Sequence, residues 1–243
     1  MYGRQSAREN RQGFDSPCLK EAPMTKTAVL VSGGGANLQP LLDMYQFGEI
    51  PELELTAVIS SVPDAYALER ASMCRIPTYV VERALFPNNA SFCNALLNKL
   101  RDVDTELVVC AGFTEKLNYP LLRFFRNRVI AVQPVLFPAF CTGELDPFTA
   151  LRKTLELGVR IAGATAYFMS EEDNGYGPII VQEAVEVLPG DTPAALSDRL
   201  MRKGEWVVLP QAVKLYCEGR LRVEGGAVII SEAEAGDGAN QGT

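Results

Sequence analysis

The sequence predicts an α/β protein with a mostly parallel sheet, helices on both faces and an antiparallel C-terminal extension. Apolar runs of strand length alternate with amphipathic helical stretches from residue 27 to residue 158. A glycine-rich turn, SGGG at residues 32–35, joins the first expected strand to the first expected helix. After residue 160, two apolar strands follow one another without a helix between them, which is typical of an antiparallel pair.

The type of each element follows from its hydrophobic period and its length. Strands are expected at 27–32, 53–61, 76–81, 106–113 and 129–132. Helices are expected at 36–48, 65–74, 89–103, 148–158 and, in broken form, 115–125. The C-terminal part should form two strands at 160–169 and 178–187, a long helix at 191–219 broken near Pro210, and a hairpin within 221–230.

One domain is expected at residues 24–230, because 243 residues of which 47% are apolar can form one core. Residues 1–23 and the polar, Gly/Ala-rich tail at 231–243 show no periodicity and are expected to be disordered. Met24 lies just before the first strand, so the sequence leaves open whether it is the true start. No signal peptide or membrane-spanning stretch is evident, which predicts a cytoplasmic protein without a membrane partner.

Composition excludes several kinds of site. The chain has no histidine, so a Ser–His–Asp triad, a Cys–His dyad and a histidine-containing zinc site are impossible. Six cysteines occur without a C-x-x-C pair, so no metal site is expected and the thiols should be free and buried. The net charge of −7, with no Lys/Arg-rich face, argues against a nucleic-acid partner.

The segment SGGGANLQ at residues 32–39 is a candidate anion site. Glycines after a strand allow a tight turn, and free N–H groups at a helix start favour a phosphate. The segment lacks the P-loop pattern, and Leu38 stands where G-x-G-x-x-G would need a third glycine. A tight turn without ligand therefore stays open, and Asn37 could equally be a helix cap.

RVIAVQPVLFPAF at residues 128–140 is expected to be a buried strand that runs into a proline-containing loop. Loops at the carboxyl ends of parallel strands commonly carry the active site in α/β proteins. Gln133 is the only polar side chain near this strand end. The loop thus has the position of an active site without an obvious acid or base.

Four segments together resemble the glycinamide ribonucleotide formyltransferases and the wider folate-dependent formyltransferase family. They are VLVSGGGANLQPLLD, LVVCAGFTEKLN, VIAVQPVLFPAFCTG, and GPIIVQEAVEVLPGDTPAALSDRL followed by KGEWVVLPQAV. The resemblance extends from about residue 24 to about residue 230 and implies the formyltransferase fold, a Rossmann-like sheet. It also implies that the glycine loop at Gly34, Gly35, Ala36 and Asn37 holds the phosphate of the ribonucleotide, and that Glu205 contacts the sugar.

The family transfers a formyl group from 10-formyltetrahydrofolate to an amine, using Asn and His in an N-x-H-P segment and a later Asp. In this sequence the matching positions hold Ala131 and Gln133. The Asp position falls on Gly175 or, counted forward, on Asn174, with Asp173 adjacent. The acidic run at 171–173 is expected to be a solvated turn more than a relocated base.

The resemblance also implies a folate pocket at Phe113, Thr114, Glu115, Lys116 and Leu117, with Glu115 at a family arginine position. We therefore expect a formyltransferase-like protein that binds a small phosphorylated ligand and lacks ordinary formyl transfer from 10-formyltetrahydrofolate. Three alternatives stay open. They are an active enzyme with a rebuilt site, an enzyme with another phosphorylated substrate and an acidic base, and a non-catalytic metabolite-sensing partner. The sequence does not set the oligomeric state.

Overall fold

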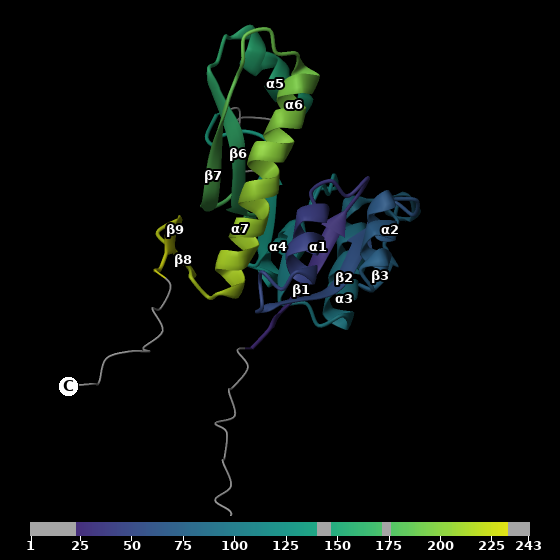
Figure 1. Cartoon of the computed structure of the whole chain (residues 1–243). Helices are drawn as coiled ribbons and strands as arrows, with labels where there is room; N and C mark the ends of the chain where they lie inside the picture. The colour runs from purple at the N-terminus through teal and green to yellow at the C-terminus, as the bar shows by residue number, and fades with distance from the viewer. Residues whose placement is uncertain (1–22, 140–146, 172–175, 233–243) are drawn as a thin grey trace, which may run out of the picture.

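The computed structural model describes residues 23–139, 147–171 and 176–232 and contains a seven-stranded sheet with helices on both faces (Figure 1). The strand order is β3-β2-β1-β4-β5-β6-β7. β3, β2, β1, β4 and β5 pair in parallel, whereas β6 is antiparallel to β5, and β7 to β6. The predicted fold class and its antiparallel extension are confirmed.

The elements follow the predicted order. The strands are β1 (Thr25–Val31), β2 (Leu53–Ser60), β3 (Thr78–Val80), β4 (Leu107–Cys110), β5 (Val129–Gln133), β6 (Ile161–Phe168), β7 (Ile179–Glu186), β8 (Leu221–Glu224) and β9 (Ala227–Ile230). The helices are α1 (Gln39–Gln46), α2 (Tyr66–Met73), η1 (Arg83–Leu85), α3 (Asn89–Asp102), α4 (Tyr119–Phe124), α5 (Pro147–Glu156), α6 (Pro193–Leu200), η3 (Met201–Glu205) and α7 (Trp206–Cys217).

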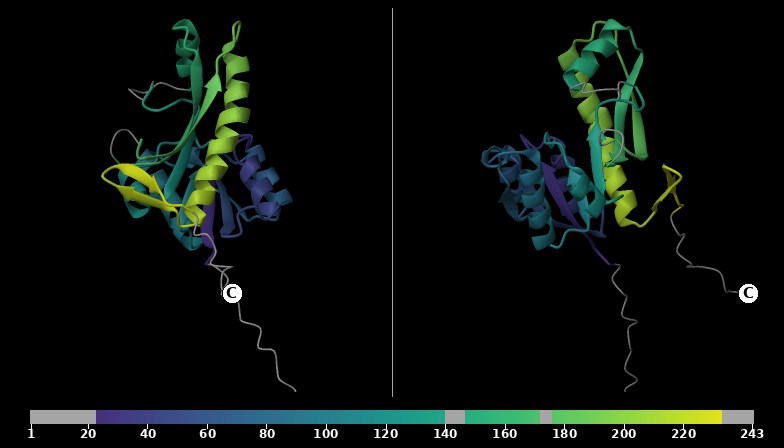
Figure 2. Two further views of the ribbon diagram at one scale, coloured as in Figure 1. Left: turned by 60° about the vertical axis from the view of Figure 1, so that its left-hand side comes forward. Right: turned by 180° about the vertical axis from the view of Figure 1, so that it is seen from behind.

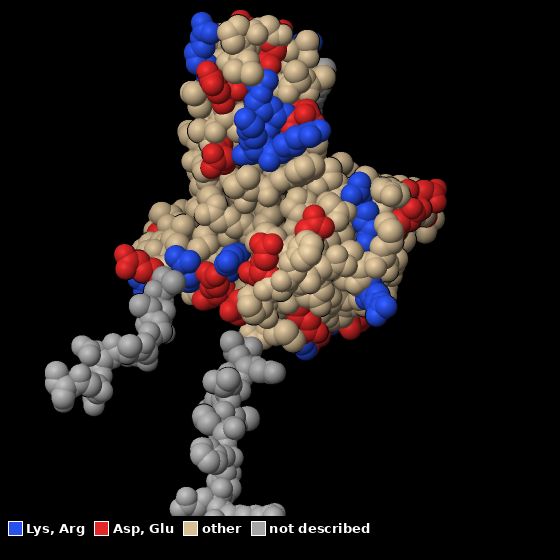
Figure 3. Space-filling model, in the orientation of Figure 1, with Lys and Arg blue, Asp and Glu red and all other residues tan. Residues whose placement is uncertain are grey.

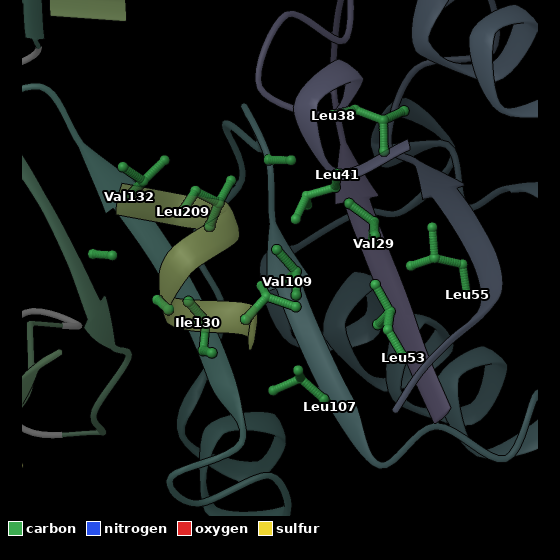
Figure 4. Close-up of a cluster of buried hydrophobic side chains, with 14 of the residues drawn as sticks. Val29, Leu38, Leu41, Leu53, Leu55, Leu107, Val109, Ile130, Val132 and Leu209 are labelled. Atoms are coloured by element: carbon green, nitrogen blue, oxygen red, sulfur yellow. The ribbon is translucent and has the colours of Figure 1, made fainter. Parts of the chain in front are cut away.

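Two apolar clusters cover the two faces of the sheet. Because side chains alternate along a strand, Val29 and Val31 of β1 enter one cluster, whereas Ala28 and Leu30 enter the other. The first cluster is closed by α1, α2 and α7, and part of it is drawn in Figure 4. The second is closed by α3 and α4. The central strands are therefore buried on both sides, as their continuous apolar runs predict.

The antiparallel part forms an arm beside the parallel sheet. Figure 2 shows β6 and β7 extending beyond the parallel strands, with α5 and α6 at the far end. α7 runs along this arm and contacts β5, β6 and β7. This helix continues directly from η3 and α6, and Glu205 at the end of η3 lies beside the loop that follows β1.

Two predicted helix starts were wrong. The first helix begins at Gln39 instead of residue 36, because residues 36–38 form turns that complete the glycine loop. The helix expected at 115–125 is confined to Tyr119–Phe124, and Asn118 caps it by accepting a bond from the Leu121 N–H. In both places the helix begins later than the apolar period predicts, because turns or a capping residue precede it.

The predicted break near Pro210 was also wrong. α7 continues through this buried proline, which lacks only the N–H that would otherwise bond to the carbonyl of Trp206. The irregularity lies one turn earlier, in the π-helical segment η3. Wider helical turns of this kind change the direction of the side chains that follow them, and they are frequent at functional sites.

The described cysteines are free, as expected: Cys93, Cys110 and Cys217 are buried and Cys74 is half-buried. Burial raises the pKa of Cys110 to about 12, so this thiol stays protonated at neutral pH. Among the helices that the structure describes, none has the length and apolar character of a membrane span.

Gly204 in η3 allows close packing of this helix on β6. A Cβ atom at this position would lie 2.9 Å from the Cβ of Ala164. We expect Gly204→Ala to lower the free energy of unfolding by about 1–3 kcal/mol, measured by urea denaturation, because the contact forces a shift in a packed core. Gly33→Ala is the control, since its Cβ would meet nothing within 4 Å. Equal stability of the two variants would contradict this account of the packing.

Candidate active site

The glycine loop lies at the carboxyl end of β1, where β1 is flanked by β2 and β4. From β1 the chain adds β2 and then β3 on one side of β1. It then crosses to the other side of β1 to add β4 and β5, so the direction in which strands are added reverses at β1. Ligands of open α/β sheets bind at such reversals. The loop is also joined to the next one: the Ser32 N–H bonds to the Gly112 carbonyl at 3.2 Å, and the Thr114 N–H bonds to the Ser32 hydroxyl at 3.0 Å.

The carbonyl groups of the glycine loop face the protein. Gly33 accepts from the Ala67 N–H at 3.1 Å, and Gly34 accepts from Arg70 Nε at 2.9 Å. Gly35 accepts from the Gln39 N–H at 3.0 Å. Within the described part of the chain, the backbone N–H groups of residues 33–38 donate to no protein acceptor. The loop therefore contains consecutive backbone donors without protein partners, and those of Gly33, Gly34 and Ala36 belong to exposed residues, as in an anion-binding nest.

Gly35 is required by both its backbone and its surroundings. Its φ is +75°, a conformation that side chains with Cβ rarely adopt. A Cβ at this position would also lie 2.9 Å from the Cβ of Ala67. The tight turn and the contact with α2 thus depend on the same residue.

Asn37 and Glu205 meet beside this loop, although they lie 168 positions apart in the sequence. Asn37 Nδ2 donates to Glu205 Oε1 at 3.1 Å. Asn37 Oδ1 is buried and has no partner within the described residues. Asn37 does not cap α1, because Leu38 occupies the cap position and α1 has no side-chain cap. The structure therefore brings two of the predicted ligand-binding residues together.

Burial raises the pKa of Glu205 above the ordinary glutamate value of 4.5, and the hydrogen bond from Asn37 partly opposes this effect. Figure 3 shows Lys and Arg side chains gathered on the face that carries α6. In η3, Arg202 and Lys203 are exposed. η3 thus carries a half-buried carboxyl group and two exposed cations.

The strand end where the sequence resemblance predicted the N-x-H-P segment carries little polar chemistry. Ala131 is buried at 6% exposure and belongs to the second apolar cluster with Cys110. Gln133 is half-buried at the last position of β5. In the antiparallel pairing of β5 with β6, Ala131 lies opposite Tyr167 and Gln133 opposite Thr165. Paired residues share a face of the sheet, so the tyrosine ring lies beside the alanine.

Three aromatic rings pack together at this position. The ring centroid of Phe137 lies 4.8 Å from that of Tyr167 and 5.0 Å from that of Tyr176. The two tyrosine rings are 5.8 Å apart. Sequence reasoning missed this cluster, although the pairing of the strands at 129–132 and 160–169 could have placed Tyr167 near Ala131.

The predicted folate-pocket residues mostly make contacts within the protein. Phe113 stacks on Phe92 with centroids 6.4 Å apart. Glu115, which the resemblance aligned with a family arginine, forms an ion pair of 3.6 Å with Arg83 of η1. The remaining members show the same tendency: the Thr114 N–H bonds to Ser32, the Lys116 carbonyl accepts from Asn89, and Leu117 is buried.

A pocket of about 390 Å³ borders the aromatic cluster at Tyr176. Leu122, Met169 and Tyr176 line it, together with Arg126 and Glu171. None of residues 113–117 lines this pocket. The predicted Asp173 and Asn174 lie outside the described residues, in the gap between Glu171 and Tyr176.

Glu171 departs from the solvated turn that the sequence predicted. Its side chain is half-buried, and its Oε2 atom is buried without a hydrogen-bond partner in the described structure. A buried carboxylate oxygen without a donor is unfavourable unless a ligand or water supplies one. Elsewhere, no three Cys, Asp or Glu side chains of the described residues are placed to hold a metal ion.

Comparison with known proteins identifies the family. The family model described as Formyl transferase matches residues 25–213, so the chain belongs to the formyltransferase family. It is 33% identical over 201 residues to a phosphoribosylglycinamide formyltransferase of Haemophilus influenzae, covering 83% of this chain and 91% of the relative. It is 34% identical over 199 residues to the trifunctional purine biosynthetic protein adenosine-3 of Bos taurus, covering 82% of this chain but 19% of that one.

Solved structures agree with this assignment. The crystal structure of glycinamide ribonucleotide transformylase 1 from Symbiobacterium toebii matches with a TM-score of 0.79 and 39% identity, covering 86% of this chain and 95% of that one. A formyltetrahydrofolate deformylase from Pseudomonas syringae matches with a TM-score of 0.78 at 21% identity, covering 87% and 67% of the two chains. This second likeness concerns the fold alone.

The raised pKa of Glu205 makes a pH-dependent prediction. A carboxyl whose pKa is higher in the folded state stabilises the fold while it is protonated, below pH 4.5. This contribution to the free energy of unfolding is lost as the pH rises through the folded-state pKa. Glu205→Gln should remove this loss, so its stability relative to the parent protein should be greater at pH 7 than at pH 4. Urea unfolding at several pH values measures the difference, with the exposed Glu183→Gln as control. Parallel pH profiles for the parent protein and Glu205→Gln would contradict it.

Proposed function

We propose that this chain binds a phosphorylated ribose-type ligand, with glycinamide ribonucleotide as its model, and lacks the ordinary formyl transfer from 10-formyltetrahydrofolate. The observation that carries the first part is the run of free backbone N–H groups at residues 33–38. The observation that carries the second is the pair of residues, Ala131 and Gln133, at the family's catalytic Asn and His positions.

The glycine loop supports binding of the phosphate. Consecutive N–H groups and the positive end of the α1 dipole both favour a negatively charged group. Gly33 and Gly34 are exposed and carry no side chain, so a phosphate can approach the backbone closely. This arrangement needs no side-chain acid or base and is therefore independent of the loss of histidine.

Asn37 and Glu205 support binding of the sugar. The Glu205 carboxylate can accept hydrogen bonds from hydroxyl groups, and its neighbour Asn37 Oδ1 is a buried acceptor that still needs a donor. Two acceptors beside a phosphate site fit a hydroxylated ligand such as a ribose phosphate. Inorganic phosphate alone would leave Asn37 Oδ1 without its donor.

The residues at the end of β5, Ala131 and Gln133, support the second part of the proposal, the lack of formyl transfer. Loss of one oxyanion donor typically lowers a rate by about 10²–10³, and loss of a general acid or base by about 10²–10⁴. Ala131 has no hydrogen-bonding group. Gln133 can donate an amide hydrogen bond but cannot exchange a proton at neutral pH. The third group would have to come from Asp173 or Asn174, beyond the described residues.

The pocket of about 390 Å³ is the candidate site for a folate, which supplies the formyl group when it is bound. Apolar walls from Leu122, Met169 and Tyr176 fit a flat ring system. The buried Oε2 of Glu171 fits a ring that carries N–H donors. Binding at this pocket is compatible with a protein that has lost the transfer step.

One observation favours a second candidate, an active formyltransferase with a rebuilt site. The Tyr167 ring lies opposite Ala131, on the face where the family places its catalytic Asn. A buried phenol is a hydrogen-bond donor that can stabilise a developing oxyanion. In such a site Glu171 would be the acidic group. It lines the same pocket as Tyr176, which packs against Tyr167.

Ligand binding tests the first part of the proposal. At 100 times its dissociation constant, glycinamide ribonucleotide should stabilise the protein by about 2.7 kcal/mol, which a thermal melt detects. Gly35→Ala should abolish the shift, because alanine fits neither the φ of +75° nor the contact with Ala67. Gly48→Ala is the matched control, with a φ of +68° and open space around it. No shift with the parent protein at millimolar ligand would refute the proposal.

A transfer assay tests the second part. Mixed at high concentration with 10-formyltetrahydrofolate and glycinamide ribonucleotide, the protein should give no formylation above the uncatalysed rate, because the groups that stabilise the oxyanion and move protons are missing. The Haemophilus influenzae relative serves as positive control. Turnover that disappears in Tyr167→Phe would establish the rebuilt site instead.

A further inference from the structure

We propose that Arg70 of α2 is a positioning residue of the phosphate site: it holds the glycine loop in the orientation that exposes its N–H groups, and it adds positive charge behind the loop. This inference rests on the proposed function, because it concerns the same ligand. This role could not be inferred from sequence alone, since an arginine on an amphipathic helix ordinarily extends into solvent.

The contacts of Arg70 join the two ends of the loop. Its Nε donates to the Gly34 carbonyl at 2.9 Å, and its NH1 nitrogen donates to Gln39 Oε1 at 2.7 Å. Gly34 lies at the start of the loop and Gln39 is the first residue of α1. One rigid guanidinium group therefore sets the separation between the loop and the helix whose positive end faces the ligand.

The bond to Gly34 also decides which way a peptide group faces. The carbonyl of Gly34 and the N–H of Gly35 belong to one planar unit and point in opposite directions. While Arg70 holds the carbonyl against α2, the Gly35 N–H is directed away from α2. Glycine has little intrinsic preference between the two orientations, so an external partner is needed to select one.

Two further contacts keep the Arg70 side chain in place. Its guanidinium carbon lies 5.0 Å from the centroid of the Tyr66 ring, a cation–π distance. Its Cδ would lie 3.2 Å from a Cβ on Gly35, so it packs directly beneath the loop. The residue is half-buried, and its contacts come from three separate segments.

The charge of Arg70 is not neutralised by a neighbouring carboxylate. Of the ion pairs formed within the described residues, none includes Arg70. Its partners are a carbonyl, an amide oxygen and an aromatic ring, all of them formally neutral. A full positive charge is thus available to a phosphate on the open side of the loop, in a chain whose net charge is −7.

The test compares Arg70→Gln with Arg128→Gln. Arg128 is the matched control: it also donates to a main-chain carbonyl, that of Phe124, and lies 5.2 Å from the Phe125 ring, but it stands at the opposite end of the sheet, just before β5. Calorimetry with glycinamide ribonucleotide should show binding about tenfold weaker or more in Arg70→Gln, as expected for a charged hydrogen bond, and unchanged in Arg128→Gln. Arg70→Lys, which keeps the charge, should recover part of the affinity.

Two readouts separate positioning from mere structural support. The salt dependence of binding should fall in Arg70→Gln, because one cation is removed from the phosphate site. In phosphorus NMR, the second ionisation of the bound phosphate should move to higher pH in Arg70→Gln relative to the parent protein.

Unchanged affinity in Arg70→Gln would overturn the inference. The inference would also be overturned if Arg70→Gln bound more weakly but kept the salt dependence and the phosphate ionisation of the parent protein. That result would show a structural role only. If Arg70→Gln does not fold, the same measurements on Arg70→Lys decide: its affinity should fall while its salt dependence is kept. Absence of binding by the parent protein would instead refute the proposed function itself.

Discussion

The orientation of three peptide groups in the glycine loop is the constraint on which the rest of the site depends. The carbonyls of Gly33, Gly34 and Gly35 are held by α2 and α1, so the N–H groups of the loop are left for a ligand. If one of these peptides turned over, a carbonyl dipole would face the anion and repel it. The loop therefore depends on the position of α2. Because α2 follows β2 in the chain, it depends in turn on the pairing of β1 with β2.

A second polar contact fixes the loop that follows Gln133. Thr165 is fully buried, accepts from the Phe137 N–H at 3.1 Å and from Gln182 Nε2 at 2.9 Å, and donates to the Val135 carbonyl at 2.7 Å. A buried hydroxyl with all its bonds formed holds a loop in one conformation. The strand end without acid–base chemistry is thus an ordered and well-packed region, in which aromatic rings occupy the space beside Ala131.

Much of the fold could be predicted because strand and helix periods are local properties of the sequence. The strands of the parallel sheet and the closing hairpin were expected where they occur, and the resemblance implied a contact of Glu205 with the sugar, whereas its bond to Asn37 is visible only in the structure. Contacts across the fold were not accessible in this way. Nothing near Arg70 shows that its partner is Gly34, and nothing in the acidic run shows that Glu171 is half-buried.

The glycines themselves distinguish a folding requirement from a ligand requirement. Gly35 is explained by packing alone, since its φ and its contact with Ala67 exclude a side chain whether or not a ligand binds. Gly33 and Gly34 have no such explanation: a Cβ would meet nothing within 4 Å at either position, and neither has a positive φ. Glycine costs conformational entropy on folding, so two unconstrained glycines in sequence need another physical reason. Close approach of the proposed ligand to the backbone would supply that reason, at the half of the site that requires no histidine.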